Sequence, residues 1–502
     1  MNPQISPLLR PGNAVLVYLQ ERLSAIFSPR LNPMYNLGAL ALYLLYAIVI
    51  SGIYIFLFYR MSLPSAYNSI QSLTEGQKYL GGIMRSIHRY ASDGLVVVVV
   101  LHALQAFFSD RFRKYRWFMW VTGCIALPVL WLEGASGYLL VADEKAKMVG
   151  VQLAGWLDTF PLAVEPFSRN FIQGGPLSSL VFFIATFVHV GLVVGIFGIL
   201  WFHNMRISRP LVDPPKELTV WFGIILVAVS ILKPAVSAPI ADLTALTGSS
   251  EIDWFYLWPF PLADAYSAAV STVFMTGAGG FLLLLVIPWI IPGPARKVDA
   301  AGAVTDVVKV DLSACTGCAQ CVKACPFEAI HIVPRTDGRK YDDEVEIYAG
   351  RCASCGLCLP ACPFPALTMG TWTNEYLIQR VKALLPNGGT GKTMVFSCGR
   401  AGVNDRIYGN AHNVVVLTLP CAGIIGTKTI NECLKLGVSG IVVASCVPED
   451  GHYRLAKRKL DLTRLEVSHL KGVKMVTVLA SRPRSILDEI QRAQAEFVEL
   501  KK

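Results

Sequence analysis

The sequence predicts a multidomain protein in which an all-α transmembrane bundle of six spans precedes a small cysteine-rich α+β module and a small parallel α/β domain. Hydrophobic residues make up 53% of the 502 residues and charged residues only 16%, which is too apolar for a wholly soluble chain. The composition changes abruptly after IPGPARK, where the apolar runs end. Two copies of one cysteine pattern and four strand-like runs follow, so the second part of the chain is expected to be soluble.

The first segment, residues 1–30, is polar and amphipathic. It contains Arg10, Arg22 and Arg30 and has no signal-peptide cleavage pattern. We expect it to lie along the cytoplasmic surface of the membrane, in contact with lipid.

Apolar runs of about twenty residues follow, long enough to cross a bilayer as helices. The four that predict a helical bundle fall within residues 31–210, and two more fall within residues 211–295. The six predicted spans are 36–59, 86–108, 117–141, 178–202, 218–236 and 272–291.

Basic residues gather in the loops after the second, fourth and sixth runs. Positive charge marks cytoplasmic loops, so these loops are predicted to lie inside. The second and fourth helices would then both run from outside to inside. The basic residues are Arg111, Arg113, Lys114, Arg116, Arg206, Arg209, Arg296 and Lys297.

Two of the apolar runs carry paired histidines: His88 with His102, and His189 with His203. A spacing of fourteen residues puts both imidazoles of a pair on nearly one helix face, about 21 Å apart. Any one of them could be an ordinary core histidine, but the same spacing in two apolar spans favours axial ligands of two stacked haems. Parallel helices would pair His88 with His189 near the outer face and His102 with His203 near the inner face.

Glycines repeat this spacing in the first and third spans, as Gly38 with Gly52 and Gly123 with Gly137. Glycine admits the closest approach of a flat macrocycle to a helix. The alternative is ordinary helix–helix packing in a membrane.

These residues, with IMRSIH before His88 and GASGYLL from Gly134, resemble cytochrome b of the bc-type quinol complexes over roughly residues 30–291. The resemblance implies a four-helix bundle with two b haems, sites for menaquinone or another quinone near both membrane faces, and a homodimer as one option. It also implies that Arg85 pairs a haem propionate, a role that suits a guanidinium.

The segment IDWFYLWPF at 252–260 is similar to the PEWYFL segment of that family's outer quinol pocket. Asp253 stands where the family has glutamate and is our candidate quinol proton acceptor. The alternative is an interfacial aromatic belt of Trp254, Tyr256 and Trp258, with no working pocket.

Residues 305–372 contain CTGCAQCVKACP and CASCGLCLPACP, two runs of the bacterial ferredoxin signature for two [4Fe–4S] clusters. In this signature the last cysteine of each run ligates the other cluster. Zinc sites or disulfides are the alternatives, which this double pattern disfavours. The predicted ligands are Cys315, Cys318, Cys321 and Cys362 for cluster one, and Cys352, Cys355, Cys358 and Cys325 for cluster two.

Residues 390–502 alternate strand-like runs (KTMVFSC, NVVVLTLP, GIVVASC, KMVTVLA) with helical stretches, which predicts a parallel α/β domain. Cys398, Cys421 and Cys446 follow three strands, at the edge where such sheets place their sites. With SCVPEDGHYR at 445–454, the domain resembles the delta subunit of methyl-viologen-reducing hydrogenase. The resemblance implies a [2Fe–2S] cluster or a docking site for a flavoprotein of heterodisulfide-reductase type or for hydrogenase-like subunits.

This chain departs from that pattern, because Arg400 or Ala401 and then Gly451 stand where the family has further cysteines. Cys433 is an alternative fourth ligand, but its place in TINECLKLG predicts a buried helical residue. Cys124 is predicted to be a small packing residue.

The assembled prediction is a membrane subunit of a quinone oxidoreductase, in a respiratory electron-transport complex of a prokaryotic cytoplasmic membrane, with its iron–sulfur head in the cytoplasm. The alternative is a membrane anchor and electron relay without a quinone site of its own. No GxGxxG, Walker loop or Ser-His-Asp arrangement occurs. The net charge of +10 lies mainly at cytoplasmic loops and the tail and implies no nucleic acid.

Overall fold

The computed structural model describes residues 6–62, 65–113, 116–158, 179–205, 212–241, 253–258, 270–291, 305–398, 413–445, 456–457, 459–461, 463 and 475–479. Cys446, Arg400, Ala401, Gly451 and the basic residues Lys114, Arg206, Arg209, Arg296 and Lys297 lie outside these ranges.

Four long helices form the bundle: α2 (Leu37–Phe58), α4 (Gly81–Phe108), α5 (Trp117–Leu139) and α8 (Ser179–Asn204). Within the described ranges, these four are long and apolar enough to cross a membrane. Helix α2 packs against α4, and α5 packs against α8. The first pair buries a core that includes Leu40, Leu44, Ala91 and Leu95.

Two further helices flank the bundle where the fifth and sixth spans were predicted. Helix α9 (Lys216–Leu232) packs against α4, and α11 (Val270–Ile290) packs against α5, where Trp120 Nε1 donates to the Leu284 carbonyl at 2.7 Å. Helix α9 ends four residues before the predicted 236, and neither helix is among the four candidate spans. Six spans therefore stay a prediction.

Short helices lie around the ends of the bundle: α3 (Ser65–Gln71), η3 (Ser72–Gly76) and α6 (Glu144–Asp158). At the N-terminus, η1 (Pro7–Leu9) leads into α1 (Arg10–Leu31), and η2 (Pro33–Tyr35) connects α1 to α2. Asn32 ends α1 by donating to Ser24 Oγ at 2.8 Å and accepting from the Met34 amide. Exposed apolar side chains on α1, among them Val15 and Ile26, suit the predicted position at a membrane surface.

The cysteine-rich module contains two antiparallel ribbons and one short helix. Strand β1 (Val308–Val310) pairs with β4 (Leu367–Met369), and β2 (Ile330–Pro334) pairs with β3 (Asp343–Ile347). Helix α12 (Gln320–Ala324) lies within the first cysteine run.

The C-terminal domain is a four-stranded parallel sheet in the order β6-β5-β7-β8, as the four strand-like runs predicted. Its strands are β5 (Thr393–Cys398), β6 (Val414–Leu419), β7 (Gly440–Ser445) and β8 (Met475–Leu479); η5 (Ala422–Ile424) and α15 (Thr427–Lys435) follow β6. Helix α13 (Asn374–Leu384) lies between the predicted domain ranges and packs on α15, where Lys382 and Glu432 form an ion pair of 3.0 Å.

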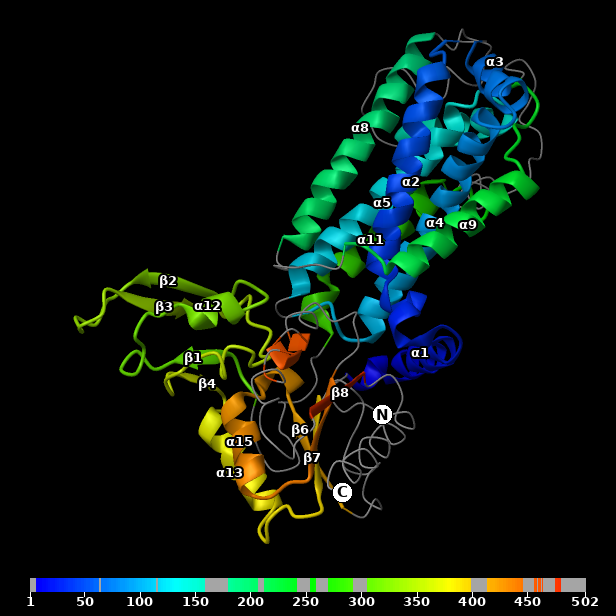
Figure 1. Cartoon of the computed structure of the whole chain (residues 1–502). Coiled ribbons are helices and arrows are strands. Elements are labelled where there is room, and N and C mark those ends of the chain that lie inside the picture. The colour runs from blue at the N-terminus through cyan, green and yellow to red at the C-terminus, as the bar shows by residue number, and fades with distance from the viewer. Residues whose placement is uncertain are drawn as a thin grey trace.

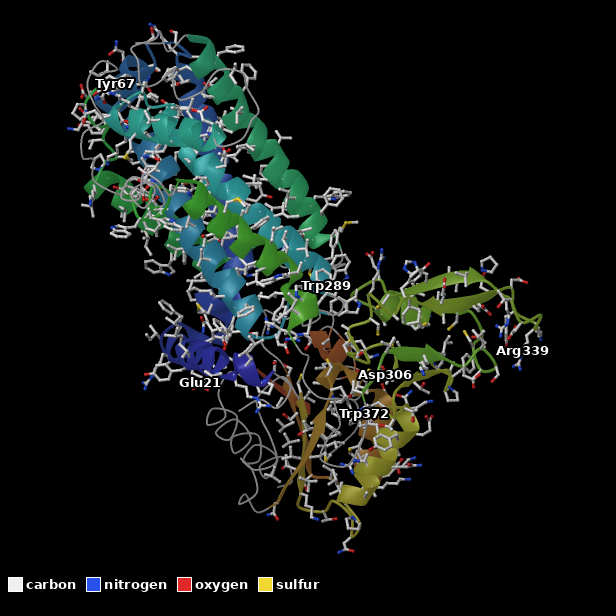
Figure 2. The ribbon with its side chains drawn as sticks, turned by 180° about the vertical axis from the view of Figure 1, so that it is seen from behind. Glu21, Tyr67, Trp289, Asp306, Arg339 and Trp372 are labelled. Carbon is white, nitrogen blue, oxygen red and sulfur yellow. The ribbon has the colours of Figure 1, made fainter. Side chains whose placement is uncertain are left out.

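Both soluble domains and α1 lie at one end of the bundle, and α3 lies at the opposite end (Figure 1). Figure 2 shows the same arrangement from behind, with Trp289 of α11 at the end near the soluble domains and Tyr67 at the far end. We call these the head end and the far end. The turn after α4, which contains Arg111 and Arg113, lies at the head end, because Arg113 Nη1 donates to the carbonyl of Ile291 at 2.6 Å.

Candidate redox sites

His88 of α4 and His189 of α8 face each other toward the far end of the bundle. Their ring centres lie 6.4 Å apart. Two metal–nitrogen bonds of about 2 Å, and about 1.1 Å from each nitrogen to its ring centre, would place two axial imidazoles on one metal about 6 Å apart. The spacing of these two rings therefore fits a haem iron between them.

In three of the four histidines, the ring nitrogen Nδ1 lies within hydrogen-bond distance of a polar group on the neighbouring helix. His88 Nδ1 lies 2.9 Å from the Ile48 carbonyl, and His189 Nδ1 lies 2.9 Å from Ser136 Oγ. His203 Nδ1 lies 3.1 Å from Thr122 Oγ1. An imidazole that donates from Nδ1 keeps the Nε2 lone pair for a metal.

The predicted glycines lie against these imidazoles. A Cβ added at Gly52 would meet His88 Cε1 at 3.0 Å, and one at Gly137 would meet His189 Cε1 at 3.2 Å. The corresponding distance is 3.5 Å from Gly38 to His102 and 3.2 Å from Gly123 to His203. Each glycine thus leaves room for an imidazole ring. That the glycines also admit the macrocycle stays a prediction.

The sequence-based prediction did not include the hydroxyl groups that contact the histidines, although the sequence contains a signal for them. Ser51, Thr122 and Ser136 each directly precede one of the four glycines and contact the histidine that this glycine faces. The dipeptide Ser-Gly or Thr-Gly therefore marks both the space and the hydrogen-bond partner for an imidazole. Gly38 is the exception, because leucine precedes it.

Arg85 lies one turn before His88 and reaches two segments at the far end. Its Nη1 is 2.5 Å from Thr74 Oγ1, and its Nη2 is 2.8 Å from Ser237 Oγ. These hydroxyls hold the guanidinium at the far end, on the side where the resemblance places a propionate.

Asp253 begins the far-end turn, residues 253–258, and its carboxylate is surrounded by donors. Oδ2 accepts from Arg89 Nη2 at 2.7 Å and from the Tyr138 hydroxyl, and Oδ1 accepts from the Phe255 amide at 2.7 Å. These three contacts hold the carboxyl group in place. The structure thus gives Asp253 an anchoring contact that the sequence did not predict.

The aromatic residues of this turn fall into two groups. Trp254 and Trp258 are 77% and 48% exposed, as an interfacial belt requires, whereas Tyr256 is 3% exposed and bonds Ser92 Oγ at 2.5 Å. Trp131 Nε1 donates to the Tyr256 carbonyl at 2.9 Å. The belt interpretation therefore fits the tryptophans and not Tyr256.

The sequence-based prediction did not include the charged side chains that α4 and α5 carry toward the far end. A charge within an apolar span is itself a signal of a functional site. Arg89 Nη1 lies 2.8 Å from Asp93 Oδ1, and Glu133 Oε1 lies 3.3 Å from His189 Nδ1.

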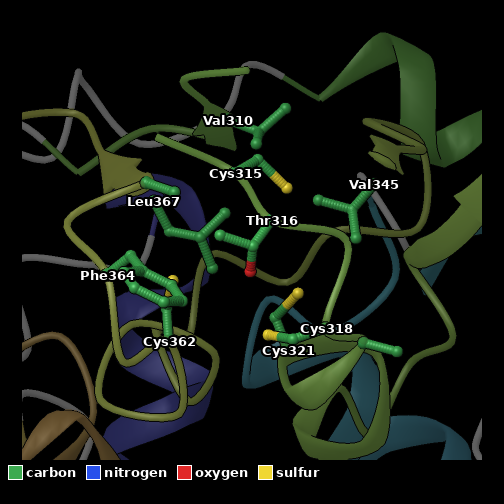
Figure 3. Close-up of a pocket in the computed structure, with 11 residues that line it drawn as sticks. Val310, Cys315, Thr316, Cys318, Cys321, Val345, Cys362, Phe364 and Leu367 are labelled. Atoms are coloured by element: carbon green, nitrogen blue, oxygen red, sulfur yellow. The ribbon is translucent and has the colours of Figure 1, made fainter. Parts of the chain in front are cut away.

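In the head, Cys315, Cys318, Cys321 and Cys362 line one cavity, which Figure 3 shows with Val310, Val345 and Phe364 around it. These four cysteines are the set predicted for cluster one. Burial raises the pKa of Cys321 to about 11, so cluster binding must release a proton from this thiol near neutral pH. Arg335 supports the loop by donating to the Cys315 carbonyl at 2.9 Å.

A second cavity is lined by Cys325, Cys352, Cys355 and Cys358, the set predicted for cluster two. Burial raises the pKa of Cys358 well above its ordinary value. Within the described ranges, no three His, Cys, Asp or Glu side chains are grouped to hold a single metal ion. Four thiols around a cavity suit a cluster that sets several irons between the sulfur atoms.

Comparisons with known proteins identify three families along the chain. Residues 22–209 match the family described as Cytochrome b/b6/petB. A cytochrome b6 of Heliobacterium mobile is 30% identical over 151 residues, which cover 30% of this chain and 68% of the relative. The chain belongs to the cytochrome b/b6 family.

A second cytochrome b relative is the menaquinol:cytochrome c reductase cytochrome b subunit of Geobacillus thermodenitrificans, 27% identical over 189 residues, with 36% of this chain and 82% of the relative covered. A solved chain titled Hyperthermophilic respiratory Complex III is more distant, with a TM-score of 0.42 and 19% identity over 51% of this chain and 75% of that chain.

The soluble part of this cytochrome b matches two further families. Residues 314–366 match the 4Fe-4S dicluster domain, and residues 397–487 match the methyl-viologen-reducing hydrogenase delta subunit. The family of the membrane part implies haem b, and the dicluster domain indicates iron–sulfur clusters. The protein is thus a membrane cytochrome b with an iron–sulfur head.

The cysteines of the delta-subunit-like domain are buried. Cys398 ends β5 and Cys421 follows β6, and a hydrogen bond with Cys398 together with burial raises the pKa of Cys421 well above its ordinary value. Cys446 lies outside the described residues. The prediction for Cys433 is confirmed, because it is a fully buried residue of α15, and Cys124 packs in α5 beside Trp120 as predicted.

Proposed function

We propose that this cytochrome b is the membrane subunit of a quinone oxidoreductase complex and exchanges electrons between the quinone pool and a cytoplasmic flavoprotein or iron–sulfur partner. Two b haems and two [4Fe–4S] clusters, when bound, supply the one-electron carriers. His88 with His189 and His102 with His203 would hold the haems. Cavity-lining cysteines of the two predicted sets would hold the clusters.

The observation that carries this proposal is the order of the sites along the molecule. The far-end turn with Asp253 lies at one end, and both cysteine cavities lie beyond the other. Between them, each long histidine helix presents one imidazole toward the far end and one toward the head end, about 21 Å apart. A chain with this order of sites is suited to move charge along the bundle axis.

The orientation follows from charge. The basic turn after α4 lies at the head end, which supports a cytoplasmic head and an outer far end. We also propose that α9 and α11 complete six spans. In this orientation Arg85 faces the outer haem site, where its guanidinium can pair a propionate.

At the far end, Arg89, Tyr138 and Asp253 would form the polar wall of a quinone site, with Asp253 within reach of a quinol hydroxyl after a shift of its partners. The name of the Geobacillus relative gives menaquinol as its quinol, and we propose that this protein also uses a menaquinol. The delta-subunit-like domain would dock the soluble partner, a flavoprotein of heterodisulfide-reductase type or a hydrogenase-like subunit.

The test is electron transfer in proteoliposomes with the head outward, a menaquinol analogue in the membrane and a water-soluble acceptor outside. Electrons that cross the bilayer against a potential cost about 2.3 kcal/mol per charge per 100 mV. We expect the rate to respond to an ionophore and to fall in Asp253→Asn. Unchanged rates in both cases would overturn the outer quinone site and favour one near His102 and His203.

One observation favours the second candidate function, a membrane anchor and relay without its own quinone site. Asp253 is already occupied by Arg89, Tyr138 and the Phe255 amide. If this is the role, electrons from a reduced partner should still reach the haems, while quinol analogues do not reduce them and quinone analogues do not oxidise them.

A further inference from the structure

Two buried thiols meet at the carboxyl edge of the C-terminal sheet. Cys398 is the last residue of β5 and pairs in register with Leu419, and Cys421 lies two residues beyond Leu419. The two side chains are 0% and 1% exposed, and the neighbouring Cys398 thiol contributes to the raised pKa of Cys421. They are therefore a pair of neighbouring sulfur atoms shielded from water.

This thiol pair adjoins the second cysteine cavity of the head. Cys355, which lines that cavity, packs against Leu357, Cys421 and Ala456. A Cβ at Gly423 would lie 2.3 Å from Leu357 Cδ2, so η5 sits directly on the cysteine loop.

The contact continues along both loops. A Cβ at Gly356 would meet Ile424 Cδ1 at 3.3 Å, and one at Gly426 would meet Pro360 Cβ at 2.8 Å. Such close backbone approaches fix the two domains together in the region of Cys355 and Cys421. The C-terminal domain is thus in position to exchange electrons with the site of cluster two.

The number of thiols at this edge argues against an all-cysteine [2Fe–2S] cluster, which takes four cysteines. Cys433 cannot join the pair, because it lies six residues into α15, about 9 Å along the helix axis. That places it toward Thr393 and Gly440, the amino ends of the strands. Even with Cys446, which lies outside the described ranges, the edge has three cysteines.

We propose that Cys398 and Cys421 form a reversible dithiol–disulfide couple that exchanges electrons with the adjacent iron–sulfur site. The inference deepens the proposed function and rests on it for the position of cluster two. In the reducing direction the S–S bond breaks, two electrons arrive one at a time from the iron–sulfur centre, and two protons from water complete the two thiols. The reverse direction forms the S–S bond and releases two electrons and two protons.

Such a couple would give the head a two-electron store at its partner-facing domain. The burial of both sulfurs limits direct exchange with thiols in solution, because thiol–disulfide exchange needs access to the attacked sulfur. Electrons from the neighbouring cluster remain the available reductant.

The first experiment uses the anaerobic full-length protein equilibrated with redox mediators at a series of potentials. Samples are quenched in acid, alkylated and analysed by mass spectrometry. We expect a Cys398–Cys421 disulfide whose oxidised-to-reduced ratio changes tenfold for about every 30 mV, as a two-electron couple requires. Alkylation of both cysteines at every potential would overturn the proposal.

Matched variants assign the pair. Cys433→Ser should leave the disulfide unchanged, and Cys421→Ser should leave Cys398 alkylatable throughout. A disulfide to Cys446 instead, or about two irons beyond the eight of the clusters that are lost in Cys421→Ser, would contradict the assignment. The second result would indicate a [2Fe–2S] cluster.

The source of electrons is tested with Cys355→Ser. Dithionite should reduce the disulfide in the native protein much faster than in the variant, while dithiothreitol in denaturant should reduce both equally. Equal dithionite rates would overturn the link to cluster two. Iron content separates the two proposals: native protein with about eight irons and no disulfide refutes the couple alone, whereas a disulfide without these irons refutes the proposed clusters.

Discussion

Arg89 of α4 and Asp253 of the far-end turn are 164 residues apart in the sequence and form an ion pair of 2.7 Å between Nη2 and Oδ2. Asp253 is 5% exposed in this pair, and Arg89 also lies over the ring of Tyr138, 4.9 Å from its centre. The contact joins two membrane helices to the turn at the predicted outer quinone site. It makes Arg89 the residue on which the position of Asp253 depends.

We predict that Arg89→Gln loosens this turn and lowers the thermal stability of the detergent-purified protein. Removing one partner of a buried ion pair costs about 3–5 kcal/mol, and the partial exposure of Arg89 reduces this to about 1–3 kcal/mol. The measurement is a melting curve followed by haem absorbance. The exposed Arg60→Gln is the control, and equal melting temperatures for both variants would contradict an anchoring role.

Histidine substitutions should separate two haems. His88→Ala or His189→Ala should remove the outer haem, and His102→Ala or His203→Ala the inner one, because each iron loses an axial ligand. Haem content by pyridine haemochrome should fall from about two to about one per chain, and redox titration should lose one step.

The control for these substitutions is His331→Ala, which changes a histidine of strand β2 in the head. Two haems retained after substitution of any of the four membrane histidines would refute the ligand assignment.

Glycine substitutions should act through the space beside the imidazoles. Gly52→Leu places a side chain where even a Cβ lies 3.0 Å from His88 Cε1, so we expect loss of the outer haem. Gly191→Leu on α8 meets nothing within 4 Å and should keep both haems. The same loss in both variants would mean that glycine at position 52 matters only for helix folding.

Cross-ligation in the head predicts a reciprocal result. Cys362→Ser should affect the cluster held mainly by the first run, and Cys325→Ser the cluster held mainly by the second, because each lines the cavity of the other run. Iron content should fall from about eight towards about four in each case, with different paramagnetic resonance signals lost.

The buried Cys124→Ser should keep both signals of the head, because this residue lies in α5. Loss of the same signal in Cys362→Ser and Cys325→Ser would contradict the two ligand sets.

The sequence by itself determined the features that repeat along one element. Fourteen-residue spacing in an apolar helix places His88 and His102 on one face, and the doubled cysteine pattern names eight residues that the structure arranges around two cavities. The four strand-like runs that alternate with helical stretches likewise predicted the four strands of the C-terminal sheet. These follow from local backbone geometry, which neighbouring residues alone determine.

Only the tertiary structure decided which distant groups meet. The partners of Asp253 come from α4 and α5, the hydroxyls of Thr122 and Ser136 reach histidines on α8, and Cys421 lies beside Cys355 of another domain. No periodicity in the sequence encodes such contacts, because they depend on how helices and domains pack across long separations. That packing is decided by close-fitting surfaces, such as Gly423 against Leu357, which become visible only when the whole chain is folded.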